Sequence, residues 1–214
     1  MEDENNKLEK LVNILKDREP EFIIKGFAGW AYKSSIQRVL EKGGVGKFKE
    51  MAWGESAELE RITSMEDFDT FHDDFVEKVA RSIKTNKGES LTYGQAQKTV
   101  NVFLKVYVDR SGLPDRTRAD LLGPWLHVPL DSYMMKYFYK EFPEYYNRYV
   151  HPIIEQLQIE YPDTRDRELL DLARVFGKKQ YYAWQNLFRN LYPSRPVLLD
   201  MVYSLKANDN SIEL

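Results

Sequence analysis

Hydrophobic residues recur at steps of three and four along most of the chain, which is the spacing of one helix face. The clearest case is the segment 64–84. Ser64 precedes it as a candidate N-cap with Asp67 at the N3 position, and Gly88 follows its end. The apolar stripe of this segment and that of the next helix predict a buried set: Phe68, Phe71, Phe75, Val79 and Val100.

The same spacing predicts further helices, whereas alternating strand patterns are short and rare. The expected helices cover 7–16, 28–42, 92–107, 132–140, 144–161, 165–174, 178–191 and 197–205. Pro152 is expected to kink or split the helix 144–161. The stretches 106–109 and 126–130 are the best strand candidates. We therefore expect an all-α fold.

The candidate connections are a Gly-rich stretch, 42–54, and a stretch with both Gly and Pro, 111–129. The run Gly43-Gly44-Val45-Gly46-Lys47 in the first could cradle a phosphate through backbone N–H groups, or cap the preceding helix. It lacks the spacing of a P-loop. With no internal repeat, residues 1–214 are expected to form a single domain whose polar end, 207–214, frays.

The composition favours a globular protein, because 43% of the 214 residues are hydrophobic and 30% are charged. No apolar run is long enough to span a membrane, and Met1-Glu2-Asp3-Glu4 does not resemble a secretory signal, so we expect a cytoplasmic location. The absence of Cys excludes disulfides, thiolate zinc sites and a Cys nucleophile. Three His residues give no pattern for a metal site, and we expect neither a metal nor a cofactor.

The charge pattern allows a local nucleic-acid surface. The net charge of −3 weighs against a protein that coats nucleic acid without specificity. Between residues 84 and 118, however, seven Lys and Arg face three Asp and Glu, a local excess of +4. Phosphate contacts need such an excess, although a solvated helix face also fits it.

Lys98 and Asp131 are the residues with the clearest chemical interpretation. Lys98 falls in the first two turns of its expected helix, where the helix dipole and apolar neighbours favour a neutral, nucleophilic amine. Asp131 follows Pro129 at the start of the next helix, where backbone N–H groups stabilise a carboxylate. Such a pair could attack a sugar C1′ as its base departs. A surface lysine and an ordinary N-cap are the simpler alternatives.

These residues also carry a family resemblance. The pattern Gly94-x-x-x-Lys98-Thr99-x-Asn101-Val102 resembles the segment after the hairpin in helix-hairpin-helix DNA glycosylases. The run 127–131 is similar to the family's Val-Pro-Val-Asp segment, which ends in the catalytic aspartate. The separation of 33 positions between Lys98 and Asp131 is similar to that in archaeal 8-oxoguanine DNA glycosylases. The resemblance covers about 45 of the 214 residues.

The resemblance implies two helical lobes with a central cleft. Residues 60–137 would form the central, catalytic-like lobe, and the N-terminal and C-terminal helices would join in the other. It also implies that Lys98 is a nucleophile within about 8 Å of the Asp131 carboxylate, since both must reach one sugar. Further candidate DNA contacts are Gly94, Gln95, Gln97, Lys105, His127, Trp125 and Trp30.

The function expected from the resemblance is a DNA glycosylase, with or without AP-lyase activity, acting in DNA repair or against modified phage DNA. Its partner would be double-stranded DNA containing a modified base, oxidised guanine first, which is flipped out of the duplex. A monomer without membrane contact is expected.

The chain lacks the family's Leu-Pro-Gly-Val-Gly hairpin, because 89–94 reads Glu-Ser-Leu-Thr-Tyr-Gly. One alternative is therefore a non-catalytic helical DNA-binding or protein-interaction module on the same scaffold. Another is an unrelated all-α interaction protein.

Overall fold

A computed structural model of the chain describes residues 2–35, 39–160 and 177–208. Within these ranges the fold is all-α, as predicted, and carries no β-strand. Two isolated antiparallel bridges, Leu40 with Thr85 and Lys84 with Ser90, are the extended pairings there. None of the helices in these ranges is both long and apolar enough to cross a bilayer.

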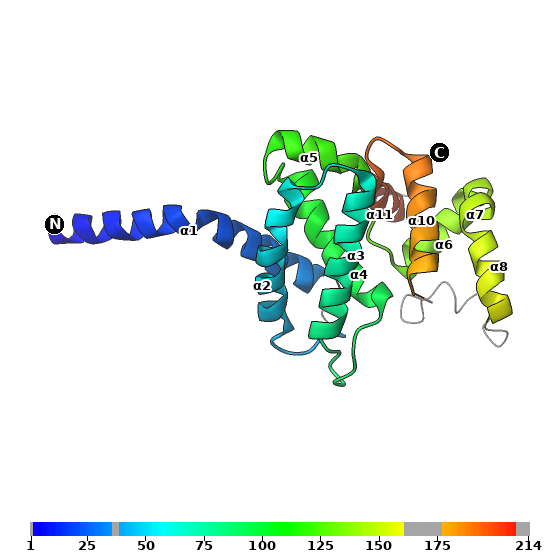
Figure 1. The fold of residues 1–214 in the computed structure, drawn as a ribbon, viewed down its shortest axis with the longest axis horizontal. Helices are drawn as coiled ribbons and strands as arrows, with labels where there is room; N and C mark the ends of the chain where they lie inside the picture. Colours follow the sequence, from blue (N-terminus) through cyan, green and yellow to red (C-terminus); the bar gives the residue numbers. More distant parts are fainter. Residues whose placement is uncertain (1, 36–38, 161–176, 209–214) are drawn as a thin grey trace.

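The helices follow one another through mostly short connections (Figure 1). In chain order they are α1 (Glu2–Ser34), α2 (Gly44–Ser56), η1 (Ala57–Glu60), α3 (Met65–Ser82), α4 (Tyr93–Leu104), η2 (Lys105–Arg110), α5 (Arg116–Leu122), η3 (Gly123–Trp125), α6 (Ser132–Glu141), α7 (Pro143–Tyr149), α8 (His151–Glu160), α10 (Gly177–Leu191), η5 (Pro196–Leu198) and α11 (Leu199–Asn208). The segment η2 is a π-helix, whereas η1, η3 and η5 are 3-10 helices.

Side-chain caps fix the starts of α3 and α4. The Ser64 hydroxyl accepts a hydrogen bond from Asp67 N at 3.1 Å, which confirms the predicted cap of α3. Thr92 and Gln95 form a reciprocal capping box at the start of α4. These bonds satisfy backbone N–H groups that have no partner inside a helix.

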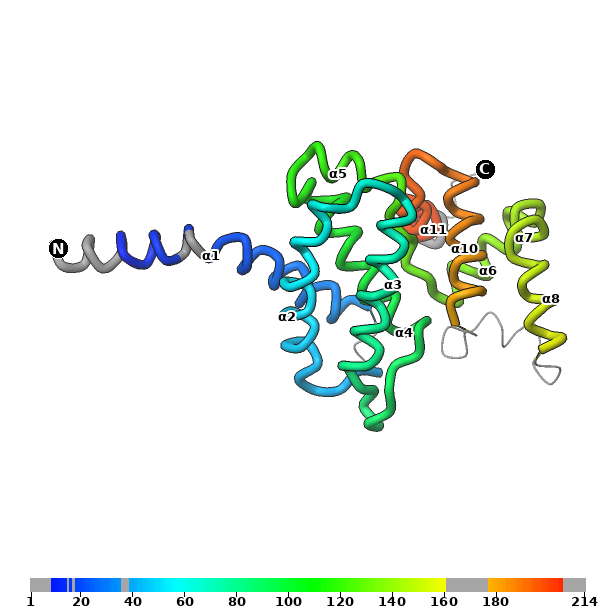
Figure 2. The backbone as a smooth tube through the Cα atoms, in the orientation of Figure 1, coloured from blue at the N-terminus to red at the C-terminus, as the bar shows by residue number. Residues whose placement is uncertain are grey.

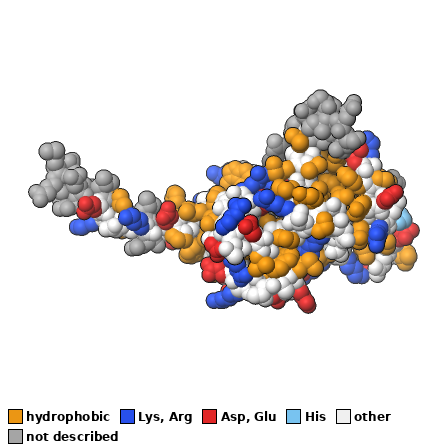
Figure 3. Space-filling view, turned by 90° about the horizontal axis from the view of Figure 1, so that it is seen from above, with side chains coloured by type: hydrophobic (Ala, Val, Ile, Leu, Met, Phe, Trp, Pro, Cys, Tyr) orange, Lys and Arg blue, Asp and Glu red, His pale blue; other side chains and the backbone are white. Residues whose placement is uncertain are grey.

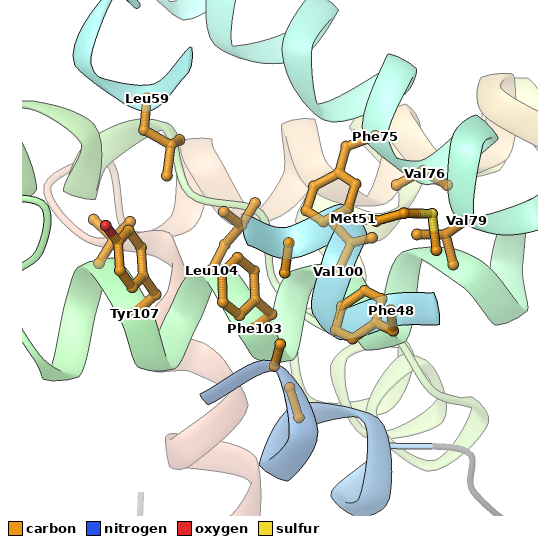
Figure 4. Packing of buried hydrophobic residues seen from close by; sticks show 14 of the residues in the cluster. Phe48, Met51, Leu59, Phe75, Val76, Val79, Val100, Phe103, Leu104 and Tyr107 are labelled. Carbon is orange, nitrogen blue, oxygen red and sulfur yellow. The ribbon is translucent and has the colours of Figure 1, made fainter. Parts of the chain in front are cut away.

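The first hydrophobic core lies where α2, α3 and α4 meet α1. Figure 4 shows Phe48 of α2, Phe75 of α3 and Phe103 of α4 converging there. The Phe48 ring stacks on Phe75 at a centroid distance of 6.0 Å and meets Phe103 edge-on at 6.1 Å. Four side chains of the predicted buried set are completely buried, whereas the fifth, Phe71, is partly buried; the four are Phe68, Phe75, Val79 and Val100.

A second core joins α6, α7, α8 and α10. Trp184 and Phe188 of α10 are fully buried in it, and Phe138 of α6 meets Phe188 at 5.0 Å. The backbone trace shows α10 between α4 and the pair α7 and α8, and it contacts all three (Figure 2). Helix α1 therefore packs in the first core with α2, α3 and α4, whereas α10 packs in the second core with α6, α7 and α8.

The region predicted as two helices, 7–16 and 28–42, differs from that prediction. A single helix, α1, runs from Glu2 to Ser34 and includes Pro20. It ends earlier than predicted because the chain next pairs with the turn before α4: Glu41 N donates to Lys84 O at 3.0 Å. These backbone bonds are incompatible with a helix to residue 42.

The segment 42–54 was predicted to be a connection, and that prediction is wrong. The segment forms most of α2. Burial of Phe48 and Met51 against the first core outweighs the low helix propensity of its glycines. The Gly43 run starts this helix instead of capping the preceding one. Gly43 has a φ of 91°, and a Cβ on Gly44 would lie 2.2 Å from the Tyr32 hydroxyl, so both positions require glycine.

Two further predictions need correction. The strand candidate 106–109 lies inside the π-helix η2, because the chain continues from α4 without a break. The connection 111–129 contains α5 and η3. The strand candidate 126–130 has no regular secondary structure, and the described part of the chain contains no strand for it to pair with.

The C-terminal predictions agree with the structure where it describes them. The helix predicted at 144–161 is split at Val150, two residues before Pro152. The helices α6 and α10 match 132–140 and 178–191 to within a residue, and α11 follows η5 in the predicted 197–205 region. The predicted helix 165–174 and positions 209–214 of the tail lie outside the described residues.

Candidate functional site

Lys98 and Asp131 form an ion pair. The Lys98 Nζ atom lies 2.9 Å from Asp131 Oδ2, within the distance expected from the sequence. The two side chains are 20% and 30% exposed, so solvent reaches them while protein surrounds most of their surface. The pair joins the second turn of α4 to the start of α6.

Asp131 uses both of its carboxylate oxygens. Oδ1 accepts a hydrogen bond from Met134 N at 2.8 Å and caps α6, while Oδ2 binds Lys98. The residue has extended backbone angles, as is usual for an N-cap residue. The cap fixes the carboxylate at the N-terminus of α6.

The neighbouring candidates on α4 serve the helix itself. Gly94 is buried in the first turn, and Gln95 closes the capping box with Thr92. Gln97 is completely buried, and its amide bonds to backbone atoms of Leu130, next to Asp131. Gln97 therefore binds the residue next to Asp131 from inside the protein and is not exposed to a ligand.

His127 is 2% exposed and lies in a buried polar cluster. Its Nδ1 is 2.8 Å from the Tyr181 hydroxyl, and its Nε2 is 2.9 Å from Asp69 Oδ1. Burial lowers the pKa of His127 to about 4, against the hydrogen bond to Asp69, which raises it. Both ring nitrogens are thus engaged inside the protein.

The cluster extends to Arg189, whose guanidinium binds both oxygens of Asp69 at 2.9 and 2.6 Å. Arg189 also donates to the carbonyl of Trp125 at 3.0 Å. The bonds from His127 and Arg189 hold the pKa of Asp69 well below its usual range, although burial opposes them. This cluster ties α3 and α10 to the segment leading to Asp131.

The two tryptophan candidates lie in different settings. Trp125 is partly buried against the first core. Trp30 is 55% exposed on α1, and none of the contacts found among the described residues joins it to Lys98 or Asp131. The structure therefore does not bring the two indoles together at the ion pair.

Lys105, the C-cap of α4 and the first residue of η2, forms a second ion pair, with Asp200 in the first turn of α11. Lys105 follows Lys98 by seven residues, so the two lysines lie on the same side of the helix. Burial, followed by the charge of Asp131, raises the pKa of Tyr203, which shows that α11 also approaches the first pair. Asp200 and Tyr203 are not among the residues predicted from the sequence; an Asp beginning an apolar helix was the available signal.

The local basic excess of 84–118 is offset in three dimensions by acids beyond that segment. Asp131, Asp200 and Asp120 pair with Lys98, Lys105 and Arg116. Figure 3 shows one face of the molecule, on which Lys and Arg side chains lie among acidic and hydrophobic ones. Strong phosphate binding by these lysines would require exchange of their carboxylate partners.

A hollow of about 650 Å³ lies elsewhere, between α1, α2, η1 and η2. Ile23, Trp53 and Tyr107 contribute to its apolar lining. Neither Lys98 nor Asp131 lines it, so it is separate from the ion pair. Across the described ranges, no group of three or more His, Asp and Glu side chains is placed to hold a metal ion.

Comparison of the chain with protein-family models, with curated proteins and with solved structures found no match.

Proposed function

We propose that the protein is a DNA glycosylase that excises a modified base with Lys98 as nucleophile and Asp131 as the stabilising carboxylate. The observation that carries the proposal is the 2.9 Å contact between Lys98 Nζ and Asp131 Oδ2, formed by residues 33 positions apart. Both side chains are partly exposed, so one sugar can reach them together. Oxidised guanine is the first substrate to test, and a cytoplasmic location fits this role.

In the proposed reaction the target nucleotide is flipped out of the duplex. The bond between C1′ and the base breaks, the base leaves with the electron pair, and Asp131 stabilises the positive charge on the sugar. The Lys98 ammonium gives up a proton, the departing base gains one, and the neutral amine bonds to C1′. Opening of the sugar gives a Schiff base, from which β-elimination of the 3′ phosphate would nick the strand.

Borohydride trapping tests this proposal, because it reduces a Schiff base to a stable protein–DNA adduct. The substrates are duplexes carrying 8-oxoguanine or another modified base, with an unmodified duplex as reference. The parent protein should form an adduct with a modified duplex, and Lys98→Gln should form none. Lys140→Gln, which changes an exposed lysine on α6, is the matched control and should trap like the parent.

Affinity separates catalysis from phosphate binding. Lys98→Gln should leave duplex affinity nearly unchanged if the lysine acts as a nucleophile. A lysine that contacts phosphate would instead weaken binding on removal and reduce the salt slope by about one unit. An adduct formed by Lys98→Gln would show that another amine reacts.

A second candidate is a helical DNA-binding module without chemistry. The observation that favours it is the ion pair itself, since Lys98 and Asp131 already satisfy each other and join α4 to α6. Duplex binding without any trapping would support this function over a glycosylase. Absence of both binding and trapping would contradict both functions.

A further inference from the structure

The segment 126–130, which has no regular secondary structure, leads to Asp131 and is bound by side chains of α4 and α10. In the described ranges no strand lies beside it, yet residues Leu126 to Leu130 are all buried. Buried backbone N–H and C=O groups need hydrogen-bond partners. For this segment, side-chain amides supply several of them.

Two glutamines bind the segment at alternate residues. Gln97 Nε2 donates to Leu130 O at 3.1 Å, and its Oε1 lies 3.4 Å from Leu130 N. Gln185 of α10 makes the same pair of bonds with Val128 N and O, both at 2.9 Å. A primary amide presents a donor and an acceptor side by side, as a peptide group in a neighbouring strand does.

The glutamines are themselves held in place. Gln97 and Gln185 are 0% and 1% exposed. Gln97 Nε2 also donates to Gly94 O at 3.0 Å, and its Oε1 accepts from Asn101 Nδ2 at 2.8 Å. Asn101 Nδ2 reaches Val128 O at 3.2 Å, which links the two binding points. This bonding pattern fixes the orientation of each amide.

The two attachments determine where Asp131 lies. Gln97 immediately precedes Lys98, and Leu130 immediately precedes Asp131. The bonds between Gln97 and Leu130 therefore set the distance between Lys98 and Asp131. We infer that Gln97 and Gln185 are positioning residues that hold Asp131 beside Lys98; the inference rests on the proposed glycosylase function. A displacement of about 1 Å at a reacting group can cost about 100-fold in rate.

Gln97→Glu tests the inference through its pH profile. An ionised carboxylate cannot donate to Leu130 O, whereas a protonated one offers a hydroxyl donor and a carbonyl acceptor. Single-turnover excision by the variant should be about 10- to 100-fold slower than by the parent at pH 8, with unchanged duplex affinity. Burial raises the pKa of an introduced carboxyl, so the ratio of variant to parent rates should rise as the pH falls.

Gln156→Glu, at an exposed position on α8, is the matched control and should show a constant ratio near one. Gln97→Met, which has similar length and no amide, tests the same contact if the buried carboxylate prevents folding. A variant-to-parent ratio near one at every pH, with either substitution at 97, would overturn the inference.

Hydrogen exchange gives a readout that does not depend on catalysis. The amide of Leu130 should exchange at least about 10-fold faster in Gln97→Met, and that of Val128 in Gln185→Met, because Met removes the side-chain oxygen that accepts from each amide. Unchanged exchange would contradict the positioning role. If the parent protein traps no DNA while these amides still lose protection, the glycosylase proposal fails although the backbone contacts are as described.

Discussion

Replacement of Asp131 by Asn separates the two tasks of this side chain. Oδ1 accepts from Met134 N and caps α6, and an Asn side-chain oxygen can replace it in that role. Oδ2 carries the negative charge that faces Lys98 at 2.9 Å, and Asn removes that charge. Asp131→Ala removes both the cap and the charge, so the two variants together measure each task.

The structure sets the expected magnitudes. With side chains 20% and 30% exposed, the ion pair should contribute about 1 kcal/mol to stability. The cap contributes about another 1 kcal/mol, so Asp131→Asn should lose roughly 1 kcal/mol and Asp131→Ala roughly 2 kcal/mol. Each kcal/mol corresponds to about 2–4 °C in Tm for a chain of this size. Loss of the charge facing the cationic sugar should slow excision by about 100- to 1,000-fold in both variants.

Two assays on the same preparations check these values: single-turnover excision from the duplex that traps best, and urea unfolding. Asp120→Asn is the control, because Asp120 is an exposed carboxylate in an ion pair on α5. It should change neither quantity measurably. Excision by Asp131→Asn at the parental rate would refute a catalytic role for the carboxylate, even if its stability changed as calculated.

Three further predictions concern stability and follow from single contacts. His127 has a pKa of about 4 in the folded protein, against 6.5 when unfolded, so the unfolded state binds more protons between these two pH values. The free energy of unfolding should therefore fall by about 2 kcal/mol from pH 7.5 to pH 5. Urea unfolding should show a smaller fall in His127→Gln. Arg189→Met leaves the Asp69 carboxylate without its buried partner and should cost about 3–5 kcal/mol in the same assay, whereas a loss below 1 kcal/mol would show that the pair is unimportant. Ser64→Ala removes the bond to Asp67 N and should lower Tm by about 2–4 °C, while Ser64→Asp, which keeps a capping oxygen, should stay near the parental value.

The predictions that depended on local chemistry agree best with the structure. Ser64 could be identified as a cap because its hydroxyl binds the backbone N–H three residues later. This bond does not depend on any distant part of the chain. The family resemblance predicted that Lys98 and Asp131 lie within about 8 Å of each other, because both must reach one sugar, and their 2.9 Å separation agrees with that prediction. The chemical roles of these residues stay predictions.

The features that the sequence did not reveal depend on contacts between distant residues. The helix α2 carries three glycines, and burial of Phe48 against α1 and α3 is what makes it helical. The alternation of Val106, Tyr107 and Val108 favours a strand, yet continuity with α4 makes it a π-helix. The pairing of Lys105 with Asp200 joins residues 95 positions apart, a relation that no local pattern contains.

The position of the trapped amine tests the central claim most directly. After borohydride reduction of the parent protein on a modified duplex, digestion and mass spectrometry locate the adduct on the chain. We expect it on Lys98, on the peptide that contains the start of α4. An adduct on any other lysine, with Lys98 unmodified, would contradict the account.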